Sequence, residues 1–213
     1  MTPTHSLTHR RGPQTLWLVV LMLVALLAGL RPPAARAAAI TVAASEVVVA
    51  ENNICSLREA IINANNDAAT HDDCAAGAGA DVITLAVGST YQFSDSFASY
   101  SGATGLPQIT TTITIDGNGS TLNRTGGTIR FLAVSNTGNL TLNDLALTSG
   151  SMTTDVGGGA IYNAGGTVTI ANAMFSGTLG SNSQGGGAIR STGGVITIDN
   201  GATREFAFRL TAD

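Results

Sequence analysis

One short unit recurs along this chain at an almost constant spacing, and this period limits the folds that the chain can adopt. The segments GGGAIYNAGGTVTI (157–170) and GGGAIRSTGGVITI (185–198) are identical at nine of fourteen positions. The apolar–Thr–apolar core of the unit occurs at 113–115, 140–142, 168–170 and 196–198, with 83–85 as a candidate earlier copy. A constant period of this size is typical of a solenoid, in which each repeat stacks on the next.

The repeated unit has the pattern of strands. Its apolar residues and Thr alternate with a period of two, which places the apolar pair on the inward face and Thr on the outward face. β-Branched residues favour this extended conformation, and the paired glycines exclude a helical repeat. The segment TIRFLAV (128–134) and the two GGAI segments indicate second strands of the same coils. We therefore predict an all-β fold over 81–200, a parallel β-helix with coils of about 27–28 residues.

Two equivalent positions follow the apolar–Thr–apolar cores at 113–115, 140–142, 168–170 and 196–198, and Asx residues occupy all of them except Gly117 and Ala171. Asx residues tolerate left-handed backbone angles in turns, and stacked Asn side chains can form ladders along a solenoid. A calcium-binding turn is the alternative, but its G-G-x-G-x-D pattern does not recur in tandem here, so we predict no metal site. The residues predicted to hold turn and ladder positions are Asp116, Asn143, Asp144, Asn172, Asp199 and Asn200.

The segment 1–39 differs from the rest and follows the order of a secretory signal peptide. A polar start with Arg10 and Arg11 precedes an unbroken apolar run at 16–30, and Ala35 and Ala37 then form an A-x-A arrangement. A membrane anchor is the alternative, but this apolar run is shorter than the roughly 20 residues that span a bilayer. We expect cleavage after Ala37 or Ala39, a secreted or cell-surface location, and no transmembrane span in the mature chain.

The charge and composition of the mature chain limit the classes of partner that it can bind. All 14 acidic residues but only six arginines lie beyond residue 39, so its net charge is 6 − 14 = −8 with His neutral. This balance argues against nucleic acid and anionic membrane surfaces as partners. Charged residues are only 11% of the chain, but the hydrophobic fraction of 44% falls in short patterned runs, which favours a folded β protein over disorder.

The segment NNICSLREAIINANND (52–67) is a charged, helix-forming exception at the start of this Gly-rich chain. Ser56 and Glu59 form the S-x-x-E pattern of a capping box. The apolar residues that follow fall on one stripe, which can cover the open end of a solenoid: Leu57, Ala60, Ile61 and Ala64.

The two cysteines of the chain flank this predicted helix. Cys55 and Cys74 could form a disulfide that closes a loop of about 20 residues, and such a bond contributes about 3 kcal/mol. Export makes a disulfide permissible. A reduced pair, or a zinc site with His71 and 72–73, is the other interpretation, although two cysteines at this spacing are weak support for zinc. The sequence thus predicts a strand and a disulfide-closed helical cap over 40–80.

The quoted motifs resemble those of a known class of bacterial proteins. CSLREAIINAN resembles the CSLREA-type N-terminal domain of large exported surface proteins, and GGGAI followed by GG-x-[VI]-T-I is similar to polymorphic outer-membrane-protein repeats. Together the resemblance covers most of 41–200. It implies a right-handed parallel β-helix of the pectin-lyase-like class, located outside the cell or at its surface and adhesin-like in role. Such chains often run longer, and the atypical tail at 201–213 is expected to be either a capping coil or the mark of a truncation.

An enzyme of the same fold class, a polysaccharide lyase or glycoside hydrolase, is the alternative function. Hydrolysis needs two carboxylates across a cleft, and Asp116 and Asp199, three coils apart, would lie ~14 Å from each other. A lyase needs a base such as Arg, and no acidic cluster adjoins the candidates. We therefore expect no catalytic residue and no cofactor, and a long polar face that contacts glycans or other cell-surface components. The enzyme candidates weighed were Asp116, Asp144, Asp155, Asp199, Arg124, Arg130 and Arg190.

Overall fold

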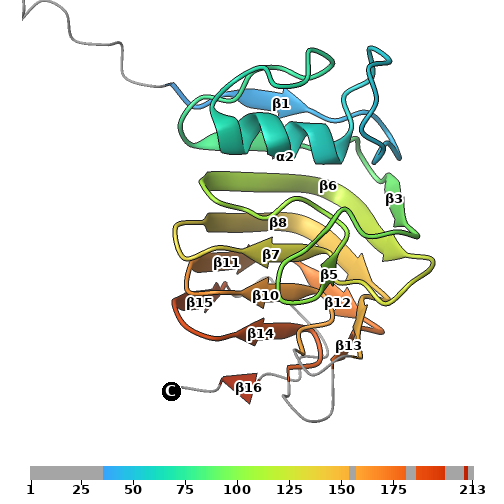
Figure 1. Ribbon diagram of the computed structural model, residues 1–213, viewed down its shortest axis with the longest axis vertical. Coiled ribbons are helices and arrows are strands. Elements are labelled where there is room, and N and C mark those ends of the chain that lie inside the picture. The colour runs from blue at the N-terminus through green and yellow to red at the C-terminus, as the bar shows by residue number, and fades with distance from the viewer. Residues whose placement is uncertain (1–35, 154–156, 181–185, 200–208, 211–213) are drawn as a thin grey trace, which may run out of the picture. The chain divides into compact units, whose positions relative to one another are not determined.

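The chain forms a parallel β-solenoid of about four turns, which confirms the predicted all-β fold (Figure 1). The computed structural model describes residues 36–153, 157–180, 186–199 and 209–210. Within these residues there is a single helix, α2 (Leu57–Asn66), at the N-terminal end of the stack. No helix in the described ranges has the length and apolarity needed to cross a membrane.

The longest sheet has eight strands, and all its pairs are parallel. Leu140 lies opposite Ile113 on one side and Val168 on the other, so the almost constant interval in the sequence is the step between neighbouring coils. The main path of this sheet is β1 (Ala39–Thr41), β2 (Asp81–Thr84), β6 (Thr112–Arg124), β8 (Asn139–Thr148), β11 (Thr167–Ala171) and β15 (Val195–Ile198). Off this path, β3 (Thr90–Phe93) pairs with β6 and β12 (Met174–Ser176) with β8.

A second parallel sheet contains the segments predicted as second strands. β7 (Leu132–Val134) lies within TIRFLAV, and β10 (Ile161–Asn163) and β14 (Ile189–Ser191) each begin at the last residue of a GGAI segment. β16 (Arg209–Leu210) extends this sheet beside β14, so the tail contributes a strand to the stack. The rest of the tail, and the predicted ladder residue Asn200, lie outside the described residues. Two small pairs complete the fold: parallel β9 (Ser151–Met152) with β13 (Leu179–Gly180), and antiparallel β4 (Ala98–Ser99) with β5 (Ala103–Thr104).

The earliest copy of the repeat was predicted in the wrong register. The sequence pattern aligned Ile83 with Ile113, but the structure pairs Ile83 with Ile115, two residues further on. A shift of two residues returns every side chain of a strand to the same face, so the alternation of apolar and polar residues cannot detect it. The first coil also contains the long segment 94–111 between β3 and β6, which displaces the spacing from the regular period.

The core lies between the sheets and consists of the inward residues of each coil. Ile115, Leu142 and Ile170 are fully buried, while the Thr residues that precede them are partly exposed. The predicted inward and outward alternation is therefore confirmed in these three coils. In β15 the position equivalent to Ile170 is open, because Ile198 exposes 37% of its surface, while Ile196 is partly buried against the core.

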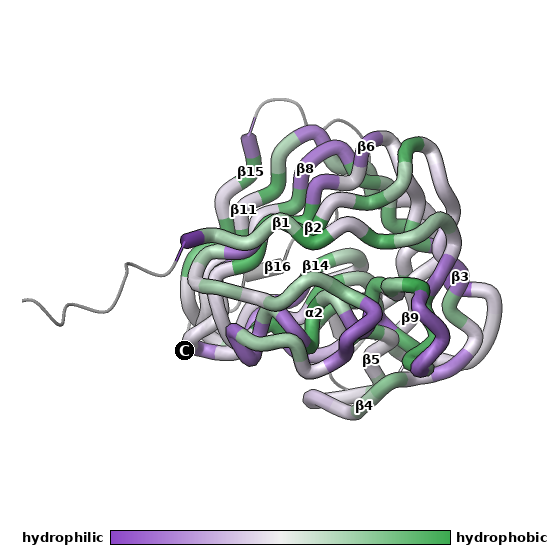
Figure 2. Tube along the Cα trace, turned by 90° about the horizontal axis from the view of Figure 1, so that it is seen from above, coloured by the Kyte–Doolittle hydropathy of each residue, from purple (hydrophilic) through white to green (hydrophobic). Residues whose placement is uncertain are grey.

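Helix α2 lies across the N-terminal end of the stack, as Figure 2 shows in a view onto that end. The predicted apolar stripe faces the solenoid, and all four of its residues are fully buried. This helix therefore covers apolar side chains that a further coil would otherwise cover. The four residues are Leu57, Ala60, Ile61 and Ala64.

Removal of one inward side chain tests this account of the core. We expect Leu142→Ala to lower the free energy of unfolding by about 2–5 kcal/mol, because it deletes buried methyl groups in a close-packed stack. The control Thr141→Ala, on the outward face of the same strand, should cost less than about 1 kcal/mol. Urea denaturation followed by circular dichroism measures both, and equal losses would contradict the assigned faces.

Candidate functional site

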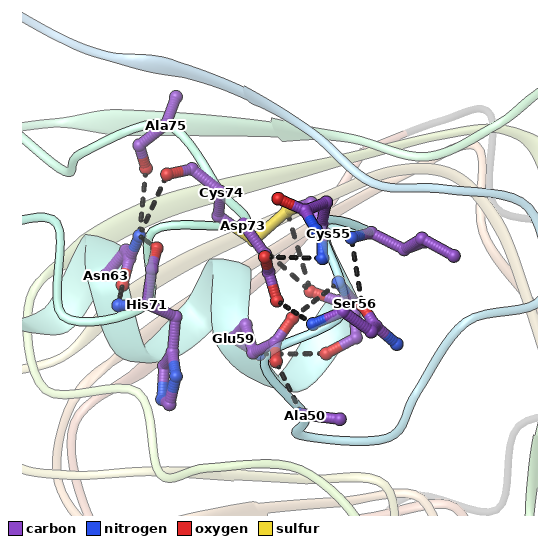
Figure 3. The surroundings of a disulfide bond; sticks show 12 residues. Ala50, Cys55, Ser56, Glu59, Asn63, His71, Asp73, Cys74 and Ala75 are labelled. Carbon is purple, nitrogen blue, oxygen red and sulfur yellow. Dashed lines mark hydrogen bonds between the residues drawn. A yellow bond between two sulfur atoms is a disulfide. The ribbon is translucent and has the colours of Figure 1, made fainter.

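The N-terminal cap is organised by Glu59, which is fully buried (Figure 3). The Ser56 hydroxyl accepts a hydrogen bond from the Glu59 backbone N–H, and the Glu59 carboxylate accepts one from the Ser56 backbone N–H at 2.9 Å. This is the reciprocal arrangement of a capping box. The other Glu59 oxygen accepts from the Ala50 backbone N–H at 2.8 Å. One side chain thus starts the helix and holds the loop that leads into it.

The Cys55–Cys74 disulfide is present, which confirms this part of the prediction. It joins the residue before the helix N-cap to the loop after the helix, and it excludes the zinc interpretation because neither sulfur remains a free thiolate. Figure 3 shows the surrounding hydrogen bonds. The buried Asn63 side chain donates to the carbonyl oxygens of His71 and Ala75 and accepts from the His71 N–H, so the helix also fixes the loop through an amide.

Arg58, between the capping residues, ties the cap to the first coil. Its Nε donates to the Gly105 carbonyl oxygen at 2.9 Å, and its guanidinium forms an ion pair with Asp95 at 3.4 Å. The guanidinium also lies over the rings of Phe93 and Phe97 at 5.9 and 5.8 Å, within cation–π range. Sequence reasoning missed this role, because these partners lie far along the chain, most of them in the non-repeated segment 94–111.

Four of the six predicted turn and ladder residues form two distinct pairs. Asp116 and Asn143 lie opposite one another inside β6 and β8, in extended backbone. Asp144 and Asn172 instead have left-handed backbone angles, with φ of 46° and 48°, and the Asn172 amide donates to the Asp144 carboxylate at 2.9 Å. The Asp199 backbone N–H donates to the Ile170 carbonyl oxygen. Turn geometry and side-chain stacking therefore coincide at Asp144 and Asn172.

A column of threonines runs along the outward face of the long sheet, one residue per coil. The register places them directly opposite each other, and neighbouring strands are ~4.8 Å apart. The column is partly exposed at its first three positions and exposed at the last. It presents hydroxyl groups at a fixed repeat on a rigid surface. Its members are Thr114, Thr141, Thr169 and Thr197.

A hollow of about 210 Å³ lies beside this column, at the bend that follows it in the same coils. Asp144 and Asn172 form its polar edge, and their side chains are exposed. Apolar atoms of Leu145, Ala146 and the half-exposed Met174 lie beside them, together with Gly119 and Ser120. Concave sites that combine a few directed polar groups with apolar surface are typical of small-ligand sites.

Arg130 and Tyr162, far apart in the sequence, meet on the outer side of the second sheet. The Arg130 guanidinium lies 4.8 Å from the Tyr162 ring centre and donates through Nη2 to the Ser101 carbonyl oxygen at 2.6 Å. Its Nε and Nη1 are buried and have no hydrogen-bond partner among the residues that the structure describes. Tyr162 lies opposite Arg190 in the neighbouring strand, so two of the candidate arginines flank one phenol ring.

Burial and neighbouring charges shift the proton affinities of this cluster. Burial, with a smaller contribution from Arg190, lowers the pKa of Arg130 to about 10, against an opposing contribution from Tyr162. Burial acts to raise the pKa of Tyr162, but hydrogen bonds with Thr192 and Ser101 and the charges of Arg190 and Arg130 outweigh it, so that this pKa is lowered. At neutral pH the Arg130 guanidinium is therefore still mainly protonated, the wrong form for a general base.

The carboxylates weighed for hydrolysis are not brought together by the fold. Asp116 lies opposite Asn143, which lies opposite Ala171, and Asp199 belongs to the coil after that. Three steps between strands separate Asp116 from Asp199 by ~14 Å, beyond the ~5–10 Å that glycosidases use. The side chain that contacts Asp144 from the next coil is the amide of Asn172, and not a second carboxylate. Asp155 lies outside the described residues.

Comparison with family models, curated proteins and solved structures gave no match to this chain. The resemblance to CSLREA-type domains and polymorphic outer-membrane-protein repeats therefore rests on the quoted motifs alone. The fold defines a class, a parallel β-solenoid of about four turns, here with a disulfide-closed helical cap. This fold is consistent with extracellular surface proteins and with pectin-lyase-like proteins.

Loss of the disulfide should weaken the whole domain. We expect the Cys55→Ser/Cys74→Ser double variant to lose about 3 kcal/mol of unfolding free energy, because the loop of about 20 residues is no longer closed in the unfolded chain. Thermal and urea denaturation with and without reductant measure this loss. Reductant should bring the wild-type protein to the stability of the double variant and leave that variant unchanged. A variant as stable as the oxidised wild type would contradict this role.

Removal of the Arg130 charge should raise the pKa of Tyr162. Arg130→Gln takes away a cation that favours the phenolate, while the burial that disfavours the phenolate remains. Ultraviolet absorbance of the phenolate against pH measures the shift in a Tyr91→Phe/Tyr100→Phe background, in which Tyr162 is the one tyrosine left. The control Arg124→Gln removes an arginine that instead donates to the carbonyls of Ser149 and Gly127, and it should leave the titration of Tyr162 unchanged. Identical curves for both variants would show that Arg130 does not act on this phenol.

Proposed function

We propose that this protein is exported and acts at the bacterial surface or outside the cell, in an adhesin-like or structural role. In this proposal it contacts glycans through the outward face of its long sheet. The threonine column is the observation that carries the proposal, because it repeats one hydroxyl per coil along the outward face of the sheet. A repeated surface of this kind matches a repeated ligand, since weak contacts at several coils add through a high effective concentration.

The hollow beside the column supports the same ligand class. The Asp144 carboxylate and the Asn172 amide offer an acceptor and a donor at its edge, and Met174 and Ala146 offer apolar contact. A sugar ring seated there can continue into the column along the same face. The left-handed backbone at both Asx residues holds their side chains at the bend in each coil.

Three features of the chain support export. The segment 1–39 has the order of a signal peptide. The Cys55–Cys74 bond is of a kind that persists in oxidising compartments outside the cytosol. The mature charge of −8, from six arginines against 14 acids beyond residue 39, favours a solvated protein without a nucleic-acid partner.

A glycan-binding assay with matched variants tests this function. We expect neutral oligosaccharides to bind more tightly as they lengthen. Thr141→Val/Thr169→Val should weaken the longer ones about thirtyfold, since each of the two lost hydrogen bonds is worth ~1 kcal/mol. The control Thr90→Val/Thr121→Val makes the same change beyond the bend, at another facing pair of the same sheet. Asp144→Ala should weaken short and long ligands alike.

The same assay separates binding from catalysis. Products with new reducing ends or unsaturated bonds, abolished by Asp144→Asn or by Arg130→Ala, would favour the lyase or hydrolase alternative. Equal losses in the two pairs of threonine variants would show that the column is not the contact surface. Binding without turnover, sensitive to the column and not to the control pair, is the expected result.

A further inference from the structure

Asp81, at the start of β2, is a buried carboxylate with an incomplete set of partners. It is 1% exposed, and its Oδ1 accepts hydrogen bonds from the backbone N–H groups of Ala38 and Ala78, both at 2.9 Å. Its Oδ2 is buried and has no hydrogen-bond partner, and no cation lies within ion-pair distance of it in the part of the chain that the structure describes. A buried carboxylate is costly unless a charge is paired with it.

Ala38 marks the border between exposed chain and folded core. Arg36 and Ala37 are exposed, whereas Ala38 is half-buried and its carbonyl oxygen accepts from the Val82 N–H at 2.9 Å. β1 begins at the next residue, and Ile40 is fully buried. The peptide bond between Ala37 and Ala38 is therefore the last one before the solenoid begins.

The two cleavage positions that the A-x-A pattern allows have different structural consequences. Cleavage after Ala39 would remove Ala38, so that Asp81 would lose one of its two donors and the Val82 N–H would lose its acceptor. It would also cut within β1 and make the core residue Ile40 the chain terminus. Cleavage after Ala37 leaves every one of these contacts in place.

We infer that the mature protein begins at Ala38 and that its new α-ammonium group forms a buried ion pair with Asp81. This inference rests on the export proposed above. A leader peptidase hydrolyses the Ala37–Ala38 amide bond: water adds its oxygen to the Ala37 carbonyl carbon, which becomes a carboxylate, and the Ala38 nitrogen leaves as an amine. That amine takes up a proton near neutral pH. The nitrogen already lies 2.9 Å from Oδ1 as an amide, so no movement is needed to bring the charges together.

The change from amide to ammonium supplies what Asp81 lacks. An amide nitrogen has one hydrogen to donate, and an ammonium has three, so a second can reach Oδ2 while the first stays on Oδ1. The positive charge compensates a carboxylate that has only neutral donors in the uncleaved chain. Removal of the signal peptide thereby completes the fold at the edge of the long sheet, and the precursor is less stable than the mature protein.

Two measurements test this inference, and the first is the N-terminus of the exported protein. Intact mass and N-terminal sequencing should give Ala38. A protein that keeps the full 21.5 kDa would overturn the proposed export, and this inference with it. A terminus at Ile40 would overturn the inference and leave export standing.

The second measurement is the melting temperature of chains with defined starts, released from one N-terminal fusion by a site-specific protease. The chain that begins at Ala38 should melt about 3–10 °C above the chain that begins at Arg36. Acetylation of the Ala38 amino group should abolish this gain without any substitution. In the Asp81→Asn variant, the chains that begin at Ala38 and at Arg36 should have the same melting temperature. Equal melting temperatures with Asp81 intact, or a gain that survives acetylation, would overturn the ion pair.

Discussion

Each coil of this protein is stable only because the next coil covers its apolar face. The inward residues of β6, β8 and β11 are fully buried because neighbouring strands hold them in line, one above the other. A stack of this kind has two ends at which the cover is missing. At the N-terminal end, the apolar stripe of α2 supplies this cover. The capping box of Ser56 and Glu59 and the Cys55–Cys74 bond stabilise the helix that carries the stripe. They are separate features of the sequence, yet they meet one requirement of the fold.

The same register that builds the core also builds the outer surface. Because each coil repeats the position of its neighbour, a threonine in one coil becomes a column in the stack, and an Asx residue at one bend becomes a pair joined by a hydrogen bond. The protein therefore presents a regular polar face without any residue that is specialised for it. A contact surface made in this way is rigid before a ligand arrives, so little ordering entropy opposes binding.

The repeated parts of the chain were predictable and the unique contacts were not. Alternation of apolar residues with Thr located the strands of both sheets, since strand periodicity depends on neighbours in the sequence. The register of Ile83 was predicted wrongly because a two-residue slip preserves that alternation. The contacts of Arg58 with Asp95, of Arg130 with Tyr162 and of Ala38 with Asp81 join residues up to 43 positions apart. No local pattern encodes such pairs, because only the stacking of coils brings them together.

The segment 94–111 shows how such a protein can acquire new surface. Only its first part leaves the stack after β3, because Thr104 and Ile109 already form parallel bridges with Arg130 and Val134 of the next coil. Arg58 and Arg130 hold the segment through the carbonyl oxygens of Gly105 and Ser101. The strands on either side keep their pairing, although this coil is longer than the others. Loop-closure entropy rises only slowly with length. A longer loop at this point of a coil therefore leaves the stacked strands paired as they are, so the surface can change there without a change of the scaffold.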